Sequence, residues 1–214
     1  MARLGRFIVL EGPDKCGKST QAALLADRLR QKGLAVVHTR EPGGTSFAEA
    51  IRAVLLDTRH RVDPLAELLL YESARAQHTK EKLLPALKQG QTVIAERYTL
   101  ATMAYQGFAR GLDLDLIRRL NHIASFGLKP DLTIILDIPE LEFGTRDKSR
   151  ELDRLEKESA DFRRKVREGY RKLAKTERGV VLLDGKLGIA ELNERIAELV
   201  EPLLARRRPK AAAR

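Results

Sequence analysis

The sequence has a single cysteine, Cys16, no tryptophan, and an aromatic content of only 5% in 214 residues. A lone cysteine excludes an internal disulfide framework and suits the reducing cytoplasm, where we expect the protein to act. The histidines, at positions 38, 60, 78 and 122, show no paired spacing, which argues against a zinc site built by the chain. The apolar run at residues 7–10 is too short for a signal peptide or a membrane span, so we expect no membrane partner.

Acidic residues are fewer than basic ones, and the formal net charge is +10. Basic chains often bind nucleic acids, but half of this excess lies in the last nine residues, as Arg206, Arg207, Arg208, Lys210 and Arg214. This segment has no apolar periodicity. We therefore predict a single α/β domain over residues 1–205 and a disordered basic tail over residues 206–214, and nucleic acid is a disfavoured partner. The remaining positive surplus suits anionic phosphate substrates.

Residues 12–19, which read GPDKCGKS, form a complete phosphate-binding loop. The loop follows an apolar strand pattern and precedes a helical pattern at residues 20–32, which is the context that its mechanism requires. Glycines let successive N–H groups converge on a phosphate, and the helix N-terminus adds partial positive charge. We expect a solvent-facing Lys18 to reach the outer phosphates of ATP and the Ser19 hydroxyl to hold Mg²⁺. The predicted ATP-binding residues of the loop are Gly12, Pro13, Asp14, Lys15, Cys16, Gly17, Lys18, Ser19 and Thr20.

Cys16 has two interpretations. The neighbouring cations and the helix N-terminus favour a reactive thiolate. Alternatively, the sulfur only fills a place where a small residue fits, and this packed, inert state is the favoured one.

Five short β-branched runs alternate with helical patterns, at residues 6–10, 35–39, 92–95, 132–136 and 180–183. This alternation predicts a five-stranded parallel sheet flanked by helices on both faces. Each run ends at polar residues, and ligands of such sheets bind beyond the carboxyl ends of the strands. The rule gathers Glu11, Arg40, Glu41, Glu96, Arg97, Asp137 and Asp184 around the phosphate loop.

Three helix features follow from local patterns. Ser46 has the character of an N-cap after the turn at residues 42–44. Residues 64–87 are predicted as one long helix, on which Tyr71, Arg75 and His78 share a face. Residues 153–175 are predicted as a highly charged helix with an apolar stripe.

The pair Glu96-Arg97 follows the strand pattern at 92–95. An acid at a strand end beside a phosphate loop commonly contacts Mg²⁺, directly or through a water molecule. Arg97 is suited to clamp an anionic acceptor through two hydrogen bonds. The alternative is a structural Arg–Glu pair, which the presence of the loop disfavours.

The chain resembles the thymidylate kinases, members of the P-loop nucleoside monophosphate kinase group. The matching segments occur in family order and read GPDKCGKST (12–20), TREPGGT (39–45), LLLYESARAQH (68–78), ERY (96–98), AYQG (104–107), PDLTIILDI (130–138) and ELDRLEKES (151–159). The resemblance implies the nucleoside monophosphate kinase fold with a short lid at about residues 142–154. It also implies transfer of the γ-phosphoryl group of ATP to dTMP with Mg²⁺, and a homodimer.

The resemblance assigns roles on the acceptor side. Asp14 matches an acid near the sugar 3′-OH and the metal, and Arg40 and Arg97 match arginines that hold the acceptor phosphate. Tyr71 matches a residue that stacks on thymine, and Arg75 matches one that reads the base edge. The other matches are Tyr105, under the sugar, Gln106, near the base, and Thr102, a further substrate-binding position.

On the donor side, Arg146 matches an arginine near the adenine of ATP, and Arg150 lies in the same lid. The sequence departs from the family pattern in having Lys15 in the loop, Glu96 for the usual Asp, and residues 99–102 poorer in Asp and Ser. Lys18, Lys15, Arg97 and Asp14 are the predicted catalytic residues. The main catalytic cation comes either from the loop, through Lys15, or from the lid, and we favour the loop because a loop cation is held rigidly.

Two alternatives to a dTMP kinase stay open at this point. The altered residues 99–102 allow a kinase for another nucleoside monophosphate or another small phosphate acceptor. A catalytically weak nucleotide-binding protein is the second alternative, and the intact loop and arginines argue against it.

Overall fold

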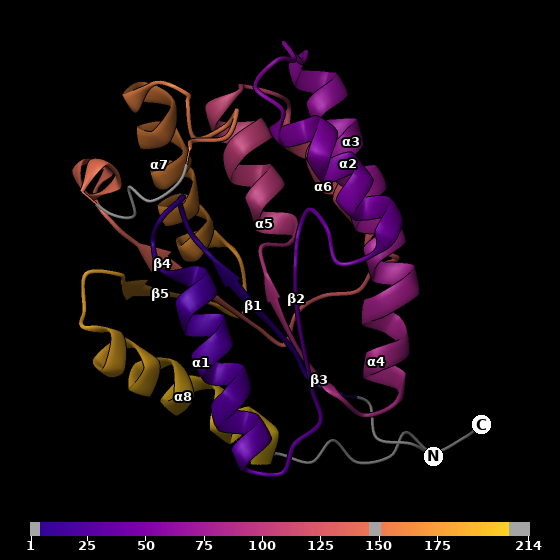
Figure 1. Cartoon of the computed structure of the whole chain (residues 1–214), viewed down its shortest axis with the longest axis vertical. Coiled ribbons are helices and arrows are strands. Elements are labelled where there is room, and N and C mark those ends of the chain that lie inside the picture. The colour runs from indigo at the N-terminus through magenta and orange to yellow at the C-terminus, as the bar shows by residue number, and fades with distance from the viewer. Residues whose placement is uncertain (1–4, 146–150, 206–214) are drawn as a thin grey trace.

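A five-stranded sheet forms the centre of the computed structural model, which describes residues 5–145 and 151–205 (Figure 1). The strands are β1 (Phe7–Glu11), β2 (Val36–Arg40), β3 (Thr92–Glu96), β4 (Leu132–Asp137) and β5 (Val180–Asp184). All neighbouring pairs are parallel, in the order β2-β3-β1-β4-β5. The predicted sheet is confirmed, and the strand that leads into the phosphate loop lies in its middle.

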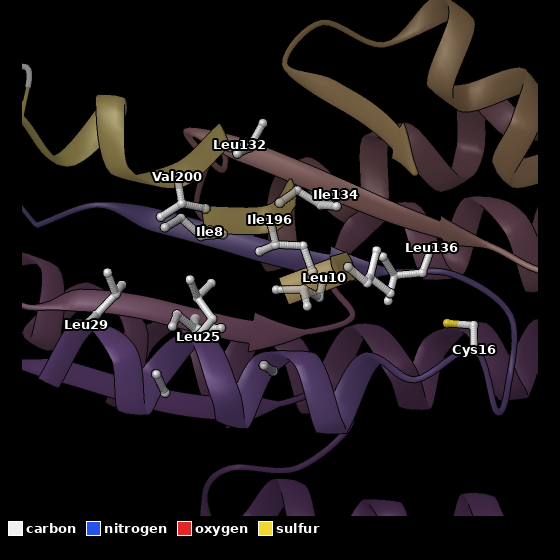
Figure 2. Packing of buried hydrophobic residues seen from close by; sticks show 14 of the residues in the cluster. Ile8, Leu10, Cys16, Leu25, Leu29, Leu132, Ile134, Leu136, Ile196 and Val200 are labelled. Carbon is white, nitrogen blue, oxygen red and sulfur yellow. The ribbon is translucent and has the colours of Figure 1, made fainter. Parts of the chain in front are cut away.

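Successive residues of β1 face opposite sides of the sheet, so both sides need an apolar cover. Ile8 and Leu10 pack against α1 (Lys18–Gln31) and α8 (Ile189–Ala205), as Figure 2 shows. Phe7 and Val9 face the other side, in a cluster with Leu83 and Leu87. Helices therefore cover both faces, as predicted.

The second face carries the longer connections. The helices here are α2 (Ser46–Leu56), α3 (Pro64–His78), α4 (Leu84–Lys88), α5 (Thr99–Thr102), α6 (Leu114–Ala124) and α7 (Ala160–Thr176). Two π-helical segments, Thr79–Leu83 and Met103–Ala109, extend α3 and α5. No helix in residues 5–145 or 151–205 combines the length and the apolar character needed to cross a membrane.

The predicted single helix over residues 64–87 is interrupted, and that prediction was wrong in detail. The chain passes from α3 through the π-helical segment Thr79–Leu83 into α4, with Pro85 in the first turn of α4. Proline has no N–H to donate back into the preceding turn, so the regular hydrogen-bond ladder breaks at this point. The predicted N-cap is also displaced by one residue: Thr45, not Ser46, caps α2 by accepting from the N–H of Ala48.

The predicted helix at 153–175 begins later, at Ala160, with Ser159 as its N-cap. Upstream, the Asp153 carboxylate accepts hydrogen bonds from the N–H groups of Leu155 and Glu156. The Arg154 N–H donates to the carbonyl O of Leu56 at the end of α2. Asp153 therefore caps a separate turn at residues 154–157, and α7 starts afterwards at its own cap, Ser159.

Two predicted segments fall wholly or partly outside the described residues. The tail at 206–214 is one, and the lid residues 146–150 are the other. The described parts of the lid are a 3₁₀ turn, Glu140–Gly144, and the chain that returns from residue 151 towards α7.

Candidate active site

The phosphate loop joins the end of β1 to the first turn of α1. Gly12 has a φ of 135°, and a Cβ there would lie 2.4 Å from the carbonyl O of Leu136, so only glycine fits. Gly17 caps α1 with a φ of 95°. The N–H groups of the first helical turn have no acceptor within the helix. The loop therefore presents a helix N-terminus at the carboxyl edge of the sheet, which is a ready anion site.

Lys18 is buried, and the expectation of a solvent-facing side chain was wrong. The residue is 7% exposed, and its Nζ donates to the carbonyl oxygens of Gly12, at 3.0 Å, and Pro13, at 2.7 Å. The loop curls back over the start of α1, so that its own carbonyl groups surround the ammonium. The charge is thus held at a fixed place inside the curl.

Cys16 is also buried, at 1% exposed, in the cluster between β1 and α1. Its Sγ lies 3.5 Å from the Nζ of Lys18. This packing supports the inert interpretation of the thiol, for which labelling is still the test. Ser19 and Thr20, at the start of α1, are exposed.

Ser19 and Glu96 meet at the edge of the sheet, as the predicted metal site requires. The Ser19 hydroxyl donates to one carboxylate oxygen of Glu96, and His38 Nε2 lies 2.9 Å from the other. Burial alone would raise the pKa of Glu96, but the hydrogen bonds of His38 and Ser19 bring it below its usual value. A hydroxyl and an ionised carboxylate are the hard oxygen donors that Mg²⁺ prefers, so these residues fit the ion.

Arg97 links the phosphate loop to the rest of the site. Its guanidinium donates to the carbonyl O of Gly12, at 3.1 Å, to the Tyr105 hydroxyl, at 3.0 Å, and to the Asp14 carboxylate. The Tyr105 hydroxyl in turn donates to Asp14 at 2.8 Å. Burial would raise the pKa of Asp14, but the charges of Arg97 and Lys18 hold it below its usual value. Three predicted site residues therefore form one charged cluster.

A second acid lies beneath this cluster. Glu11, at the end of β1, is fully buried and accepts from the N–H of Tyr98, at 2.7 Å, and from the Tyr170 hydroxyl, at 2.8 Å. Burial raises its pKa, against the lowering effect of the Arg97 charge. The strand-end rule placed Glu11 at this edge, whereas nothing in the sequence marked Tyr170, 159 residues away, as its partner.

A cavity opens beside Asp14 and Arg97. Four more predicted acceptor residues line it: Tyr71, Thr102, Tyr105 and Gln106. Burial raises the pKa of Tyr71 and Tyr105, so both phenols stay protonated. The structure therefore brings these predicted acceptor residues together next to the phosphate loop.

Two predicted acceptor residues are not among those that line this cavity. Arg75 is 1% exposed and lies behind the wall, where its guanidinium donates to Glu41 at 2.8 Å and Glu72 at 2.7 Å. Arg40 is exposed at the end of β2 and pairs with Glu49 at 2.9 Å. It lines the neighbouring groove that also contains His38 and Glu96.

Two charged lining residues were missed by the sequence analysis. Arg52 of α2 lines the cavity and donates to the carbonyl O of Pro42 at 3.0 Å. Asp153 lines the cavity from the lid side, and burial raises the pKa of its carboxyl group. Arg52 belongs to no motif, and only its position eight residues after the end of the REPGG segment was available as a signal.

The described part of the lid approaches the loop through Lys15. Its Nζ lies 4.7 Å from the centroid of the Phe143 ring. Arg154, in contrast, pairs with the buried Glu67 at 2.6 Å and donates to the carbonyl O of Leu55 at 2.7 Å. Arg154 is therefore held away from the loop, and Arg146 and Arg150 lie outside the described residues.

A phosphate loop at the central strand of a parallel sheet, with a polar cavity directly beside it, defines a P-loop kinase of the nucleoside monophosphate kinase type. Within this class, the thymidylate kinase family model matches residues 10–196 of the chain. The chain belongs to the thymidylate kinase family.

Individual relatives agree with this assignment. The thymidylate kinase of Thermoanaerobacter sp. (strain X514) is 43% identical over 94% of this chain and 99% of its own length. That of Synechococcus sp. (strain JA-3-3Ab) is 48% identical over 92% of this chain and 96% of its own length. The crystal structure of thymidylate kinase from Ehrlichia chaffeensis superposes with a TM-score of 0.76, at 30% identity, over 92% of this chain and 98% of that one.

Proposed function

We propose that this protein transfers the γ-phosphoryl group of MgATP to dTMP, giving dTDP and ADP. The single observation that carries the proposal is the position of Arg97. Its guanidinium contacts the phosphate loop through the carbonyl O of Gly12 and reaches into the neighbouring cavity beside Asp14 and Tyr105. One cation therefore lies between a donor site and an acceptor site.

Phosphoryl transfer requires positioning and positive charge more than a covalent catalyst. A monophosphate acceptor is already ionised, so the chain need not supply a strong base. Arg97 holds the acceptor phosphate, and Lys18 exchanges its two carbonyl partners for oxygens of ATP. Tyr105 and Asp14, joined by their hydrogen bond, form the sugar end of the acceptor site.

Mg²⁺, when bound, neutralises charge on the phosphates of ATP. Ser19 and Glu96 are the residues that would hold it, Glu96 directly or through a water molecule. Lys15 adds a cation from the loop. The lid, residues 142–154, excludes water, and within it Arg146 and Arg150 contact ATP.

Tyr71 and Gln106 form the base end of the acceptor site in this proposal, with Thr102 beside them. The Gln106 side-chain amide is fixed by a hydrogen bond to the buried Glu67 at 2.8 Å. A fixed amide beside the Tyr71 ring supplies directional selection among bases. Arg75, which lies behind the cavity wall, is assigned to recognition of the base edge. Arg40, in the adjacent groove, is assigned to binding of the acceptor phosphate.

A panel of acceptors tests this function. ADP release is measured with dTMP, dUMP, CMP, GMP and the ribonucleotide UMP at matched concentrations. We expect dTMP to be the best acceptor. The kcat/KM for dUMP should be lower by about 10–200-fold, because the loss of one methyl contact lowers kcat/KM by no more than that. A preference for CMP or GMP would assign the protein to another acceptor, and turnover by none of them would support a binding protein without kinase activity.

We also propose a cytoplasmic homodimer. The lone cysteine suits a reducing compartment. Large apolar side chains are exposed on adjacent elements, namely Phe47 and Val54 of α2, Leu65 and Leu69 of α3, and Ile123 of α6 (Figure 1). Exposed apolar side chains on neighbouring helices favour self-association. Light scattering on the purified protein, compared with Leu69→Glu, tests whether this face forms the dimer.

A further inference from the structure

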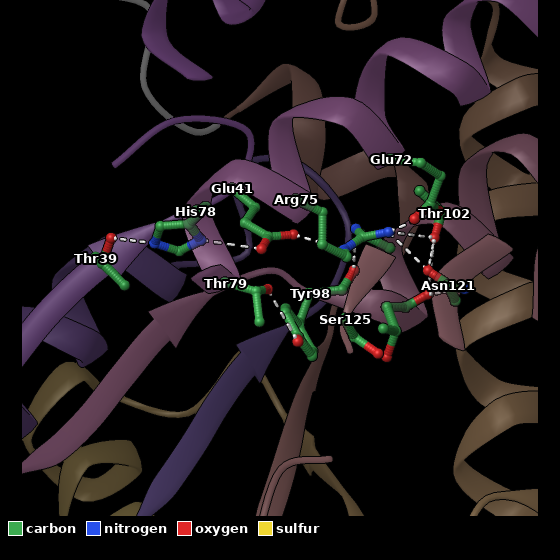
Figure 3. A network of polar contacts seen from close by, with 12 residues as sticks. Thr39, Glu41, Glu72, Arg75, His78, Thr79, Tyr98, Thr102, Asn121 and Ser125 are labelled. Atoms are coloured by element: carbon green, nitrogen blue, oxygen red, sulfur yellow. Dashed lines mark hydrogen bonds and ion pairs between the residues drawn. The ribbon is translucent and has the colours of Figure 1, made fainter. Parts of the chain in front are cut away.

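Behind the acceptor cavity lies a buried polar chain that includes Arg75 and Thr102, and its other members Thr39, Glu41 and His78 have no assigned role (Figure 3). His78, at the end of α3, is completely buried. Its Nε2 lies 2.8 Å from the Thr39 hydroxyl, and its Nδ1 lies 3.0 Å from one carboxylate oxygen of Glu41. The other carboxylate oxygen of Glu41 accepts from Arg75 at 2.8 Å. Buried polar groups of this kind are costly unless each has a partner.

Two contacts connect His78 to the turn at residues 41–44, one to Glu41 and one to Gly44. Glu41 and Pro42 line the acceptor cavity. A Cβ on Gly44 would lie 2.7 Å from the imidazole Nε2 and 2.6 Å from the Thr39 hydroxyl, so the turn backbone rests directly on the ring and its partner. The imidazole therefore supports both ends of the turn, Glu41 by a hydrogen bond and Gly44 by direct packing.

The other end of the chain reaches the opposite wall of the cavity. Arg75, held by Glu41, donates to the carbonyl O of Tyr98 at 2.9 Å and to the side-chain O of Asn121 at 2.6 Å. The Thr102 hydroxyl lies 2.9 Å from that same oxygen. Glu41 and Thr102 thus face the cavity while their orientation is set from behind it.

We propose that His78 is a positioning residue for the acceptor: its Nδ1–H fixes the Glu41 carboxylate, and with it the turn 41–44 and Arg75. The proposal rests on the assignment of this cavity as the dTMP site. Nδ1 carries the proton that it donates to Glu41, and Nε2 accepts the proton of the Thr39 hydroxyl. His78 contacts no substrate and no residue of the phosphate loop.

Two amide substitutions separate the two ring nitrogens. The side-chain nitrogen of His78→Asn falls near the place of Nδ1 and can still donate to Glu41. The longer side chain of His78→Gln falls near Nε2 and keeps only the Thr39 contact. His78→Asn should retain the dTMP KM of the wild type within about threefold. His78→Gln should raise it by about tenfold, the equivalent of the roughly 1.4 kcal/mol expected for one unsatisfied buried acceptor.

In both variants the ATP KM should change by less than about twofold, since His78 is remote from the loop. Ile196→Val in α8 is the matched control, because it weakens the core on the other face of the sheet by a modest amount. Thr39→Val should have a smaller effect on the dTMP KM than His78→Gln, because Glu41 keeps its donor.

Hydrogen exchange supplies a readout that does not depend on turnover. Peptides that cover residues 41–45 should exchange faster in His78→Gln than in the wild type, and His78→Asn should lie between them. Equal dTMP KM values and equal exchange in the two amide variants would overturn the proposal. Wild-type protein without dTMP turnover would instead refute the proposed function, and the exchange comparison would still decide the role of His78.

Discussion

Lys15 combines a strained backbone with a predicted catalytic charge, so its replacement should separate stability from activity. Its φ is 61°, in the left-handed region that glycine adopts freely and lysine adopts only at a cost in free energy. A left-handed residue with a Cβ costs about 1–2 kcal/mol. The greater freedom of glycine in the unfolded chain offsets about 0.4–1 kcal/mol of that. Lys15→Gly should therefore be more stable than Lys15→Ala by about 0.5–1 kcal/mol.

Both variants lose the same contact with the Phe143 ring, so their difference isolates the backbone. For a chain of this size, 0.5–1 kcal/mol corresponds to about 1–4 °C in Tm, which differential scanning calorimetry resolves. Their activities should fall together. A cation at the transferring phosphoryl group is worth roughly 10³–10⁵ in rate, and we expect a loss in kcat of about 10³ in both.

Arg154→Ala is the matched control for a cation on the lid side. Arg154 is engaged by Glu67 and by the carbonyl O of Leu55, so its loss should mainly lower Tm. The accompanying loss of kcat should be small. The reasoning fails if the Gly and Ala variants at position 15 have the same Tm, or if both keep kcat within about threefold of the wild type. A larger loss of kcat in Arg154→Ala than in Lys15→Ala would place the catalytic cation in the lid.

Four further outcomes are expected. Lys18→Ala should lower kcat by at least about 10³ and also lower Tm, because two carbonyl oxygens lose a charged donor; calorimetry and turnover on the same sample check both. The pKa of Asp14 is below its usual value of 3.8, so the stability it contributes is present above pH 3.8 and lost as the pH falls through the lower folded value; Asp14→Asn should flatten that acid limb of a Tm–pH curve. Cys16 should react slowly with iodoacetamide with and without MgATP, because it is 1% exposed, and fast labelling that ATP prevents would establish the thiolate. A chain that ends at Ala205 should keep kcat and KM within about twofold, and a tenfold loss would give the tail a role in catalysis.

The sheet was predictable because its signal is local. Each strand is a β-branched run between polar residues, and burial on both faces gives the continuous apolar pattern of a parallel sheet. The strands extend one residue further than predicted at their carboxyl ends, since backbone pairing does not stop at a polar side chain. Glu11, for example, still pairs with Ile135 of β4.

The depth of a side chain was not predictable from the same patterns. Helical spacing correctly put Tyr71 and Arg75 on one face of α3, yet Tyr71 lines the cavity and Arg75 is sealed behind it by Glu41 and Glu72. Lys18 was misjudged for a similar reason, because the partners that bury it are backbone carbonyls, which carry no sequence signal. Arg52 was missed because only the folded chain brings α2 against the cavity.

The carbonyl O of Gly12 accepts from both Lys18, at 3.0 Å, and Arg97, at 3.1 Å. The cation of the donor site and the cation of the acceptor site thus share a single backbone atom. Removal of either one changes the electrostatic environment of the other, so their energetic effects are not separable. In a double-mutant cycle on these two residues, the sum of the single losses will not equal the loss in the double variant, and the difference measures how strongly this one atom joins the two halves of the site.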